Sequence, residues 1–193
     1  MHIVGIMGSP RRNSNTEILL DAALSAAAES GATTQKVVAC ELNIHPCTEC
    51  YRCEANGLCV LSDDMSGLYD ALVAADRIVV ASPVFFYGFS AQTKALIDRC
   101  QALWVRRYVL KSWQPDVESR RGALISVGAT KGPRLFDGIV LTAKYFFDAV
   151  GVRDFDQLLV RGVDARAQVR EFPVHIEQAA ELGAGLSVGP ARG

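Results

Sequence analysis

A chain of 193 residues, half of them hydrophobic, is long enough for one domain with a well-filled core. Its net charge of −1 gives no electrostatic reason to expect a nucleic acid or an anionic membrane as a partner. The first residues lack the pattern of a signal peptide, and no stretch approaches the roughly 20 apolar residues of a membrane span. We therefore expect a soluble cytoplasmic protein.

Short β-branched runs alternate with longer stretches of helical periodicity, a pattern typical of stacked βαβ units. The predicted strands are residues 2–7, 36–42, 77–82, 122–127 and 156–161. The predicted helices are residues 14–30, 63–75, 91–107, 135–150 and 174–182. Five apolar strands alternating with five helices predict a doubly wound α/β fold, whose parallel sheet is covered on both faces.

The predicted domain covers residues 1–183, and the small residues of 184–193 predict a flexible tail. Two connections, residues 43–62 and 104–121, exceed the usual 2–6 residues between elements, and long connections are often functional. The second carries Trp and Arg side chains, a composition typical of interfaces, although an exposed basic loop would look the same.

Small polar residues and one arginine follow the first predicted strand: Ser9, Arg11, Ser14, Asn15 and Thr16. The next helix begins near Ser14, and backbone N–H groups at a helix N-terminus bind anions. Ordinary helix capping accounts for the same residues. The glycine-rich motifs of dinucleotide-binding folds and of P-loop NTPases are absent. The loop therefore predicts a phosphate site of another class, in which Arg11 offers a bidentate contact.

Two further loops follow the third and fourth predicted strands, at the same edge of the sheet. The candidate ligand-binding residues there are Pro83, Val84, Phe85, Phe86, Tyr87, Gly128, Ala129 and Thr130. Phe85 and Phe86 would also suit a hydrophobic core, but Pro83 and Gly88 mark a turn rather than a continued strand. Aromatic and small residues of this kind suit the binding of a planar ring.

Four of the six cysteines crowd into the first long connection, at Cys47, Cys50, Cys53 and Cys59. Outside secreted proteins, a tight cysteine cluster is more often metal-binding or catalytic than a disulfide framework. Three thiols at three-residue steps with a fourth nearby favour a [4Fe–4S] cluster. Structural zinc more usually takes two separated C-x2-C pairs. Zinc, or thiols and disulfides without a metal, remain alternatives. Cys40, expected in the second strand, and Cys100 are expected to pack in the core.

Gly8-Ser9-Pro10-Arg11 followed by Asn15-Thr16 resembles the phosphate loop of the NADPH-dependent FMN reductase group, in the flavodoxin-like superfamily. Residues 82–87 and 90–99 are similar to that group's second flavin loop and the helix after it. With the cysteine insertion, the chain resembles the iron–sulfur flavoproteins within this group.

The resemblance implies a flavodoxin-like five-stranded sheet in which the third strand neighbours the first, with FMN as cofactor. It also implies a [4Fe–4S] cluster on the four cysteines, near the FMN of a neighbouring subunit in a homodimer or homotetramer. The electron donor would be NAD(P)H or a ferredoxin, and the acceptor a small molecule. Because the flavin supplies the chemistry, no side chain is predicted to be catalytic. Two alternatives are an NAD(P)H-dependent FMN or quinone reductase without a cluster, and a zinc-bound or redox-sensing flavin module.

Overall fold

The computed structural model describes residues 1–188, which contain one parallel sheet in the strand order β2-β1-β3-β4-β5. The strands are β1 (His2–Met7), β2 (Thr33–Val38), β3 (Arg77–Pro83), β4 (Arg121–Gly128) and β5 (Phe155–Arg161). Every neighbouring pair of strands is parallel. The predicted doubly wound, flavodoxin-like architecture is therefore confirmed, and so is the position of β3 beside β1.

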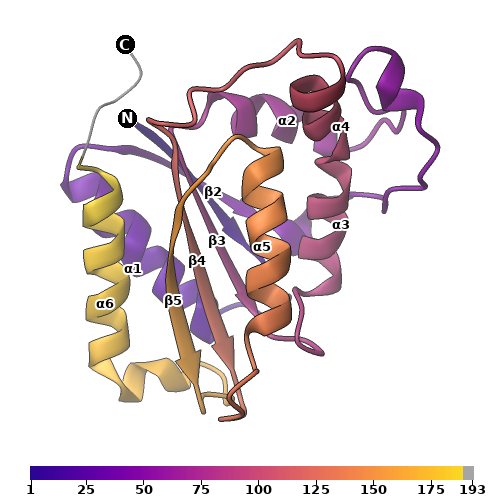
Figure 1. The fold of residues 1–193 in the computed structure, drawn as a ribbon. Coiled ribbons are helices and arrows are strands. Elements are labelled where there is room, and N and C mark those ends of the chain that lie inside the picture. Colours follow the sequence, from indigo (N-terminus) through magenta and orange to yellow (C-terminus); the bar gives the residue numbers. More distant parts are fainter. Residues whose placement is uncertain (189–193) are drawn as a thin grey trace.

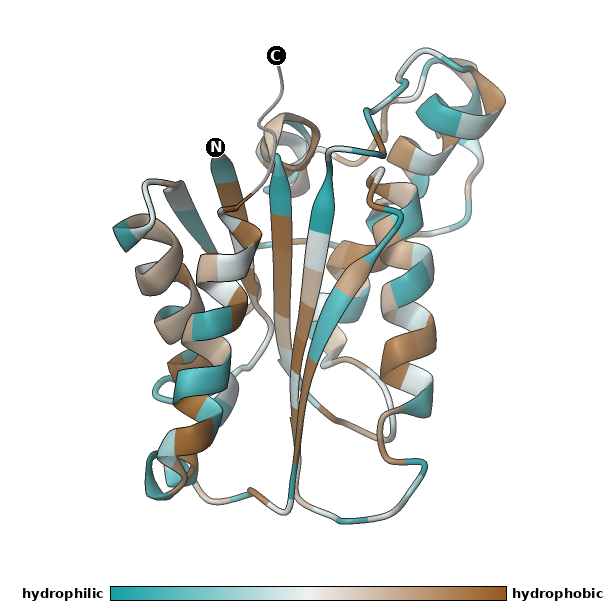
Figure 2. Cartoon of the chain, turned by 60° about the vertical axis from the view of Figure 1, so that its left-hand side comes forward, coloured by the Kyte–Doolittle hydropathy of each residue, from teal (hydrophilic) through white to brown (hydrophobic). Residues whose placement is uncertain are grey.

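Helices cover both faces of the sheet, α1 and α6 on one side and α2 to α5 on the other (Figure 1). They are α1 (Asn15–Glu29), α2 (Met65–Ala74), α3 (Ala91–Arg99), α4 (Gln101–Trp104), α5 (Asp137–Ala149) and α6 (Pro173–Leu186). The central strands carry hydrophobic side chains towards both helical layers, and Figure 2 shows them as mainly brown ribbons between helices of mixed colour. Two hydrophobic clusters result, one on each side of the sheet.

The second strand and the third helix differ from their predictions. The second strand begins at Thr33 and ends at Val38, and Cys40 lies in the short 3-10 turn Ala39–Glu41 that follows it. This strand is at the sheet edge, where exposed polar residues interrupt the apolar run that sequence periodicity detects. The long helix predicted for residues 91–107 is divided into α3, α4 and a wide π-type turn, Val105–Val109.

The C-terminal helix is longer than predicted. It continues to Leu186, whose side chain is 3% exposed and whose carbonyl accepts a 3.0 Å hydrogen bond from Nε of Arg77. The prediction of a flexible tail from residue 184 is therefore wrong for the last turn of α6, and its final part, residues 189–193, lies outside the described residues. Among residues 1–188, no helix has the length and apolar character needed to cross a membrane.

Candidate functional site

The loop after β1 leads directly into α1, and its polar residues cap that helix. Oγ of Ser14 accepts the backbone N–H of Glu17 at 3.1 Å, so Ser14 is the N-cap. The hydroxyl residues Ser9, at the start of the loop, and Thr16, in the first turn of α1, are each 1% exposed. Capping and anion binding are therefore compatible here, because α1 keeps further N–H groups in its first turn.

The carboxylate of Glu17 lies beneath this loop and accepts hydrogen bonds from the Asn13 N–H at 2.7 Å and from Lys36 at 2.9 Å. Burial alone would raise the pKa of Glu17, but the Lys36 hydrogen bond and charge and the Asn13 N–H outweigh burial and lower it. Lys36 thus compensates the negative charge nearest to the helix N-terminus. The loop can consequently still attract an anion.

A small cavity of about 70 Å³ opens at the carboxyl edge of the sheet, where the loops after β1, β3, β4 and β5 meet. We call it the edge cavity. Its lining consists of Ser9, Arg11, Ser14, Asn15, Thr16, Pro83, Val84, Phe85, Val127, Ala129, Val163 and Asp164. Nine of the thirteen predicted cofactor-binding residues are among them. The order β2-β1-β3 puts the switch in strand order at β1, which is where open α/β sheets bind ligands.

Gly8 fastens the first loop to the start of α3. Its carbonyl accepts hydrogen bonds from Oγ of Ser90 at 2.5 Å and Oγ1 of Thr93 at 3.2 Å. A Cβ atom at position 8 would lie 2.3 Å from the Thr93 hydroxyl, so only glycine fits without rearrangement. The two ligand-side loops are therefore held in a fixed relation by buried hydrogen bonds.

Four predicted residues do not line the edge cavity: Phe86, Tyr87, Gly128 and Thr130. Phe86 and Tyr87 form the tip of a hairpin closed by two hydrogen bonds between Phe85 and Gly88, of 3.0 and 2.9 Å. Both tip residues have positive φ, +48° and +65°, as a type I′ turn requires. Both side chains are exposed, Phe86 fully so, and they therefore stand outside the cavity.

The last two residues are Gly128, which ends β4, and Thr130, in the loop after it. Gly128 is buried against Leu135, and its carbonyl accepts the Gly162 N–H at 2.8 Å, so it contacts protein rather than the cavity. Thr130 is exposed. Ala129, between them, does line the cavity.

Sequence reasoning missed one wall of the cavity, the segment of residues 163–169 after β5. The Asn15 amide holds this wall through Nδ2, which donates to the Ala165 carbonyl at 3.0 Å, and Oδ1, which accepts the Val169 N–H at 3.0 Å. The Asn15 side chain was expected to donate to phosphate, but its oxygen and one N–H are already engaged. About 150 residues separate the partners, so no local sequence signal could have identified the wall.

The four clustered cysteines line a second, open cavity of about 420 Å³ beside the C-terminal end of α3, which we call the cysteine cavity. All four are free thiols, Cys47 and Cys50 exposed and Cys53 and Cys59 half-buried. Within residues 1–188, no three Cys, His, Asp or Glu side chains converge closely enough for a single metal ion. Cys100, by contrast, is buried in the core as predicted, with a raised pKa because of its burial.

The chain enters and leaves the cysteine loop side by side, at a segment pair that we call the neck (residues 43–45 and 61–64). Asp63 in the neck forms two hydrogen bonds with Arg99 of α3, of 2.7 and 3.1 Å. Burial alone would raise the pKa of Asp63, but the hydrogen bonds from Arg99 and His45 and the Arg99 charge lower it to about 2. This buried ion pair joins the cysteine loop to the helical layer.

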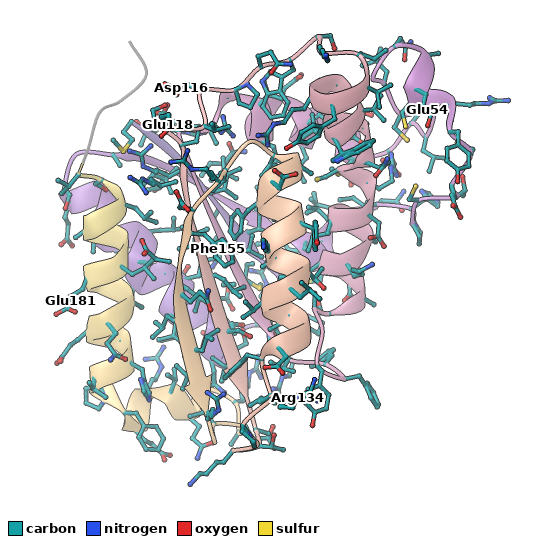
Figure 3. All side chains as sticks on the ribbon, viewed as in Figure 1. Glu54, Asp116, Glu118, Arg134, Phe155 and Glu181 are labelled. Carbon is teal, nitrogen blue, oxygen red and sulfur yellow. The ribbon has the colours of Figure 1, made fainter. Side chains whose placement is uncertain are left out.

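The two cavities lie at opposite ends of α3. The helix begins at the Ser90 and Thr93 contacts with Gly8 and ends at Arg99, which lines the cysteine cavity. In Figure 3, Glu54 of the cysteine cavity and Arg134 of the loop after β4 lie at opposite ends of the molecule. At 1.5 Å per residue, about 10 residues of helix separate the cavities by about 15 Å.

Comparison with known proteins identifies the family. Residues 1–135 match the family model described as NADPH-dependent FMN reductase. The chain belongs to this family. Within the NADPH-dependent FMN reductase family, it is 39% identical over 131 residues to an iron-sulfur flavoprotein of Methanosarcina thermophila, covering 68% of this chain and 65% of the relative. A second iron-sulfur flavoprotein, from Methanocaldococcus jannaschii, is 35% identical over 131 residues, covering 68% and 64%. The expected resemblance is thereby confirmed.

Each match spans slightly less than two thirds of the length of these two iron-sulfur flavoproteins. Among solved structures, an FMN-dependent NADH-azoreductase from Bacillus anthracis in complex with FMN superposes with a TM-score of 0.73 at 12% identity, covering 97% of this chain and all of the other. At that identity the likeness supports the flavodoxin-like fold alone. The family match includes the loops after β1, β3 and β4 and the cysteine loop, and ends before α5.

Proposed function

We propose that this member of the FMN reductase family is an FMN-binding oxidoreductase that holds the FMN phosphate in the edge cavity. The observation that carries the proposal is the meeting of the loops after β1, β3 and β4 around one small polar cavity at the N-terminus of α1. A volume of about 70 Å³ is enough for a phosphate group and too small for a whole flavin. When bound, FMN supplies hydride and single-electron chemistry.

The chain's own residues have distinct roles in this proposal. The hydroxyls of Ser9, Ser14 and Thr16 and the first N–H groups of α1 would donate to the phosphate oxygens. Arg11, which also lines the edge cavity, would supply a positive charge. Residues 83–85 would provide the apolar wall next to the ring, and Phe86, Tyr87, Gly128 and Thr130 stay predictions for cofactor binding.

For the cysteine cavity we propose a [4Fe–4S] cluster that supplies single electrons to the flavin. The donor set fits, because four free thiols line one cavity and each can bind one iron of a cubane. The irons of a cubane are separate, so its ligands need not converge on one point as they do around a single ion. The absence of a single-ion site among residues 1–188 is therefore compatible with the proposal.

The arrangement of the two cavities supports transfer between copies of the chain. Because α3 separates them by about 15 Å, the cysteine cavity is far from the edge cavity of its own chain. A homodimer or homotetramer would bring it close to another copy's flavin. The electron donor would be NAD(P)H or a ferredoxin, and the acceptor a small molecule.

An NAD(P)H-dependent FMN or quinone reductase without a cluster is the second candidate. One observation favours it: the family description names NADPH. A related fold, at 16% identity, also occurs in a protein named NAD(P)H:quinone oxidoreductase, with a TM-score of 0.70.

Anaerobic purification separates the two candidates. We expect flavin absorption bands, a broad iron–sulfur shoulder, and about four irons and four sulfides per chain. Zinc without iron, or thiols alone, would contradict the cluster but leave the flavin proposal intact. NADPH oxidation with an added quinone by iron-free protein would establish the second candidate, and absence of any FMN binding would overturn both.

A further inference from the structure

The neck of the cysteine loop is closed by hydrogen bonds between residues that lie outside the loop itself. The Asn43 N–H donates to the Asp64 carboxylate at 2.7 Å, and the Asp64 N–H donates back to the Asn43 carbonyl at 3.3 Å. The His45 N–H donates to the Asp63 carboxylate at 3.0 Å. The entering and leaving segments are thus fastened together without the participation of any cysteine.

One arginine binds both segments of the neck. In addition to its ion pair with Asp63, Arg99 donates from Nη1 to the His45 carbonyl at 2.8 Å and from Nη2 to the Leu61 carbonyl at 3.3 Å. His45 lies just before Cys47, and Leu61 just after Cys59. Both side chains of the ion pair are almost completely buried, at 0% exposure for Arg99 and 1% for Asp63. The guanidinium makes four hydrogen bonds here, two to the carboxylate and one to each carbonyl, whereas a lysine ammonium has only three N–H donors.

Arg99 also lines the cysteine cavity. Its Nε atom is buried and, among the residues that the structure describes, has no hydrogen-bond partner. A second arginine binds further along the loop, since Nε of Arg106 donates to the Gly57 carbonyl at 2.7 Å. The helical layer therefore fixes the loop at the neck and again between Cys53 and Cys59.

We infer that Arg99 is the positioning residue of the cysteine cavity: it closes the neck before any cluster is present and so sets the separation of Cys47 from Cys59. The expected effect on cluster binding rests on the proposed function. The closed neck itself is a property of the metal-free chain. Preorganised ligands lose less conformational freedom when a cofactor binds, so opening the neck should weaken cluster retention.

Two variants of the full chain test this inference, Arg99→Met and the double variant Asp63→Leu/Arg99→Met, which removes the buried carboxylate that the single variant leaves unpaired. The matched control is Arg120→Met. Arg120 is equally buried, donates to the carbonyls of Leu72 and Val73, and likewise has an unpartnered Nε, but it does not bind the neck.

Three quantities are measured: hydrogen exchange of the neck amides before reconstitution, FMN per chain, and iron and sulfide per chain after anaerobic reconstitution. We expect both Arg99 variants to exchange the neck amides about tenfold faster and to retain about a tenth of the iron, with normal FMN. The control should keep neck protection and iron. If Arg99→Met does not fold, the same three measurements on the double variant decide whether the inference holds.

Unchanged neck exchange in the Arg99 variants would overturn the inference, and so would faster exchange with a full complement of iron. An equal loss of iron in the control would also overturn it, because the effect would then be general destabilisation. If the unmodified chain takes up no cluster at all, the proposed cluster fails separately. Neck exchange alone then decides whether Arg99 closes the neck.

Discussion

Ser9 and Thr16 are buried hydroxyl residues that line the edge cavity. Oγ of Ser9 accepts the Arg11 N–H at 3.2 Å, and Oγ1 of Thr16 lies 3.3 Å from Oγ of Ser14. If each hydroxyl also donates to the FMN phosphate, replacing either residue by alanine removes a charge-assisted hydrogen bond worth about 1.5–3 kcal/mol. We expect Ser9→Ala and Thr16→Ala each to weaken FMN binding about 10- to 150-fold in a fluorescence titration. Ser30→Ala, at the far end of α1, should bind FMN normally. Unchanged affinity in the first two variants would contradict the phosphate assignment.

Substitution of Gly8 tests how closely the loop after β1 packs against its neighbours. In Gly8→Ala the new methyl group would meet the Thr93 hydroxyl at 2.3 Å and the Ala81 carbonyl at 3.0 Å. We expect a loss of about 1–3 kcal/mol in the free energy of unfolding, measured by urea denaturation of cofactor-free protein. Gly132→Ala is the control, because no atom lies within 4 Å of the corresponding position. Equal effects at both sites would refute the close fit.

The hairpin of residues 85–88 has two aromatic residues at turn positions whose positive φ favours Asn and Gly. Type I′ turns favour Asn-Gly, whereas Phe86 and Tyr87 must hold positive φ values that aromatic residues rarely adopt. We expect Phe86→Asn/Tyr87→Gly to stabilise cofactor-free protein by about 1–3 kcal/mol in urea denaturation. The same variant tests the predicted flavin role of the two aromatic side chains. Unaltered FMN affinity would show that neither contributes to binding.

Sequence periodicity located the strands of the sheet well, with the exception of the edge strand β2. The central strands β1, β3 and β4 were located to within one residue at each end, because their apolar runs are continuous. The edge strand β2 was placed three residues too late at its start, since exposed polar side chains break its pattern. The split between α3 and α4 was missed as well, because apolar periodicity continues through both.

Long-range side-chain contacts were beyond sequence reasoning. Asn15 lines the edge cavity, but the wall that it holds comes from the far end of the chain. Arg99 was part of a recognised motif, yet nothing in that motif indicates an ion pair with Asp63. Such pairs depend on how helices pack, and neither propensity nor periodicity encodes them.

For the whole molecule, the Asp63–Arg99 pair predicts a definite acid sensitivity. The pKa of Asp63 is lowered from 3.8 to about 2, so its stabilising effect is complete above pH 4 and is lost as the pH falls towards 2. We expect the free energy of unfolding to fall by about 2 kcal/mol more in the natural chain than in Asp63→Asn over this interval, measured by urea denaturation. The control is Asp137→Asn, which breaks an exposed ion pair. Its free energy of unfolding should fall over this pH interval as much as that of the natural chain. Parallel curves for Asp63→Asn and the natural chain would argue against the pair.

The closed neck also makes the cysteine loop an exchangeable unit of the fold. The groups that close the neck, at residues 43–45, 61–64 and 99, all lie outside residues 46–60, which contain every cysteine of the cavity. A short turn could replace those fifteen residues while the sheet and the edge cavity keep their contacts. The helical layer would lose the Arg106–Gly57 hydrogen bond and the packing of Cys53 and Cys59. On this architecture the cysteine loop can be gained or lost by insertion or deletion at one point, without redesign of the sheet edge that carries the edge cavity.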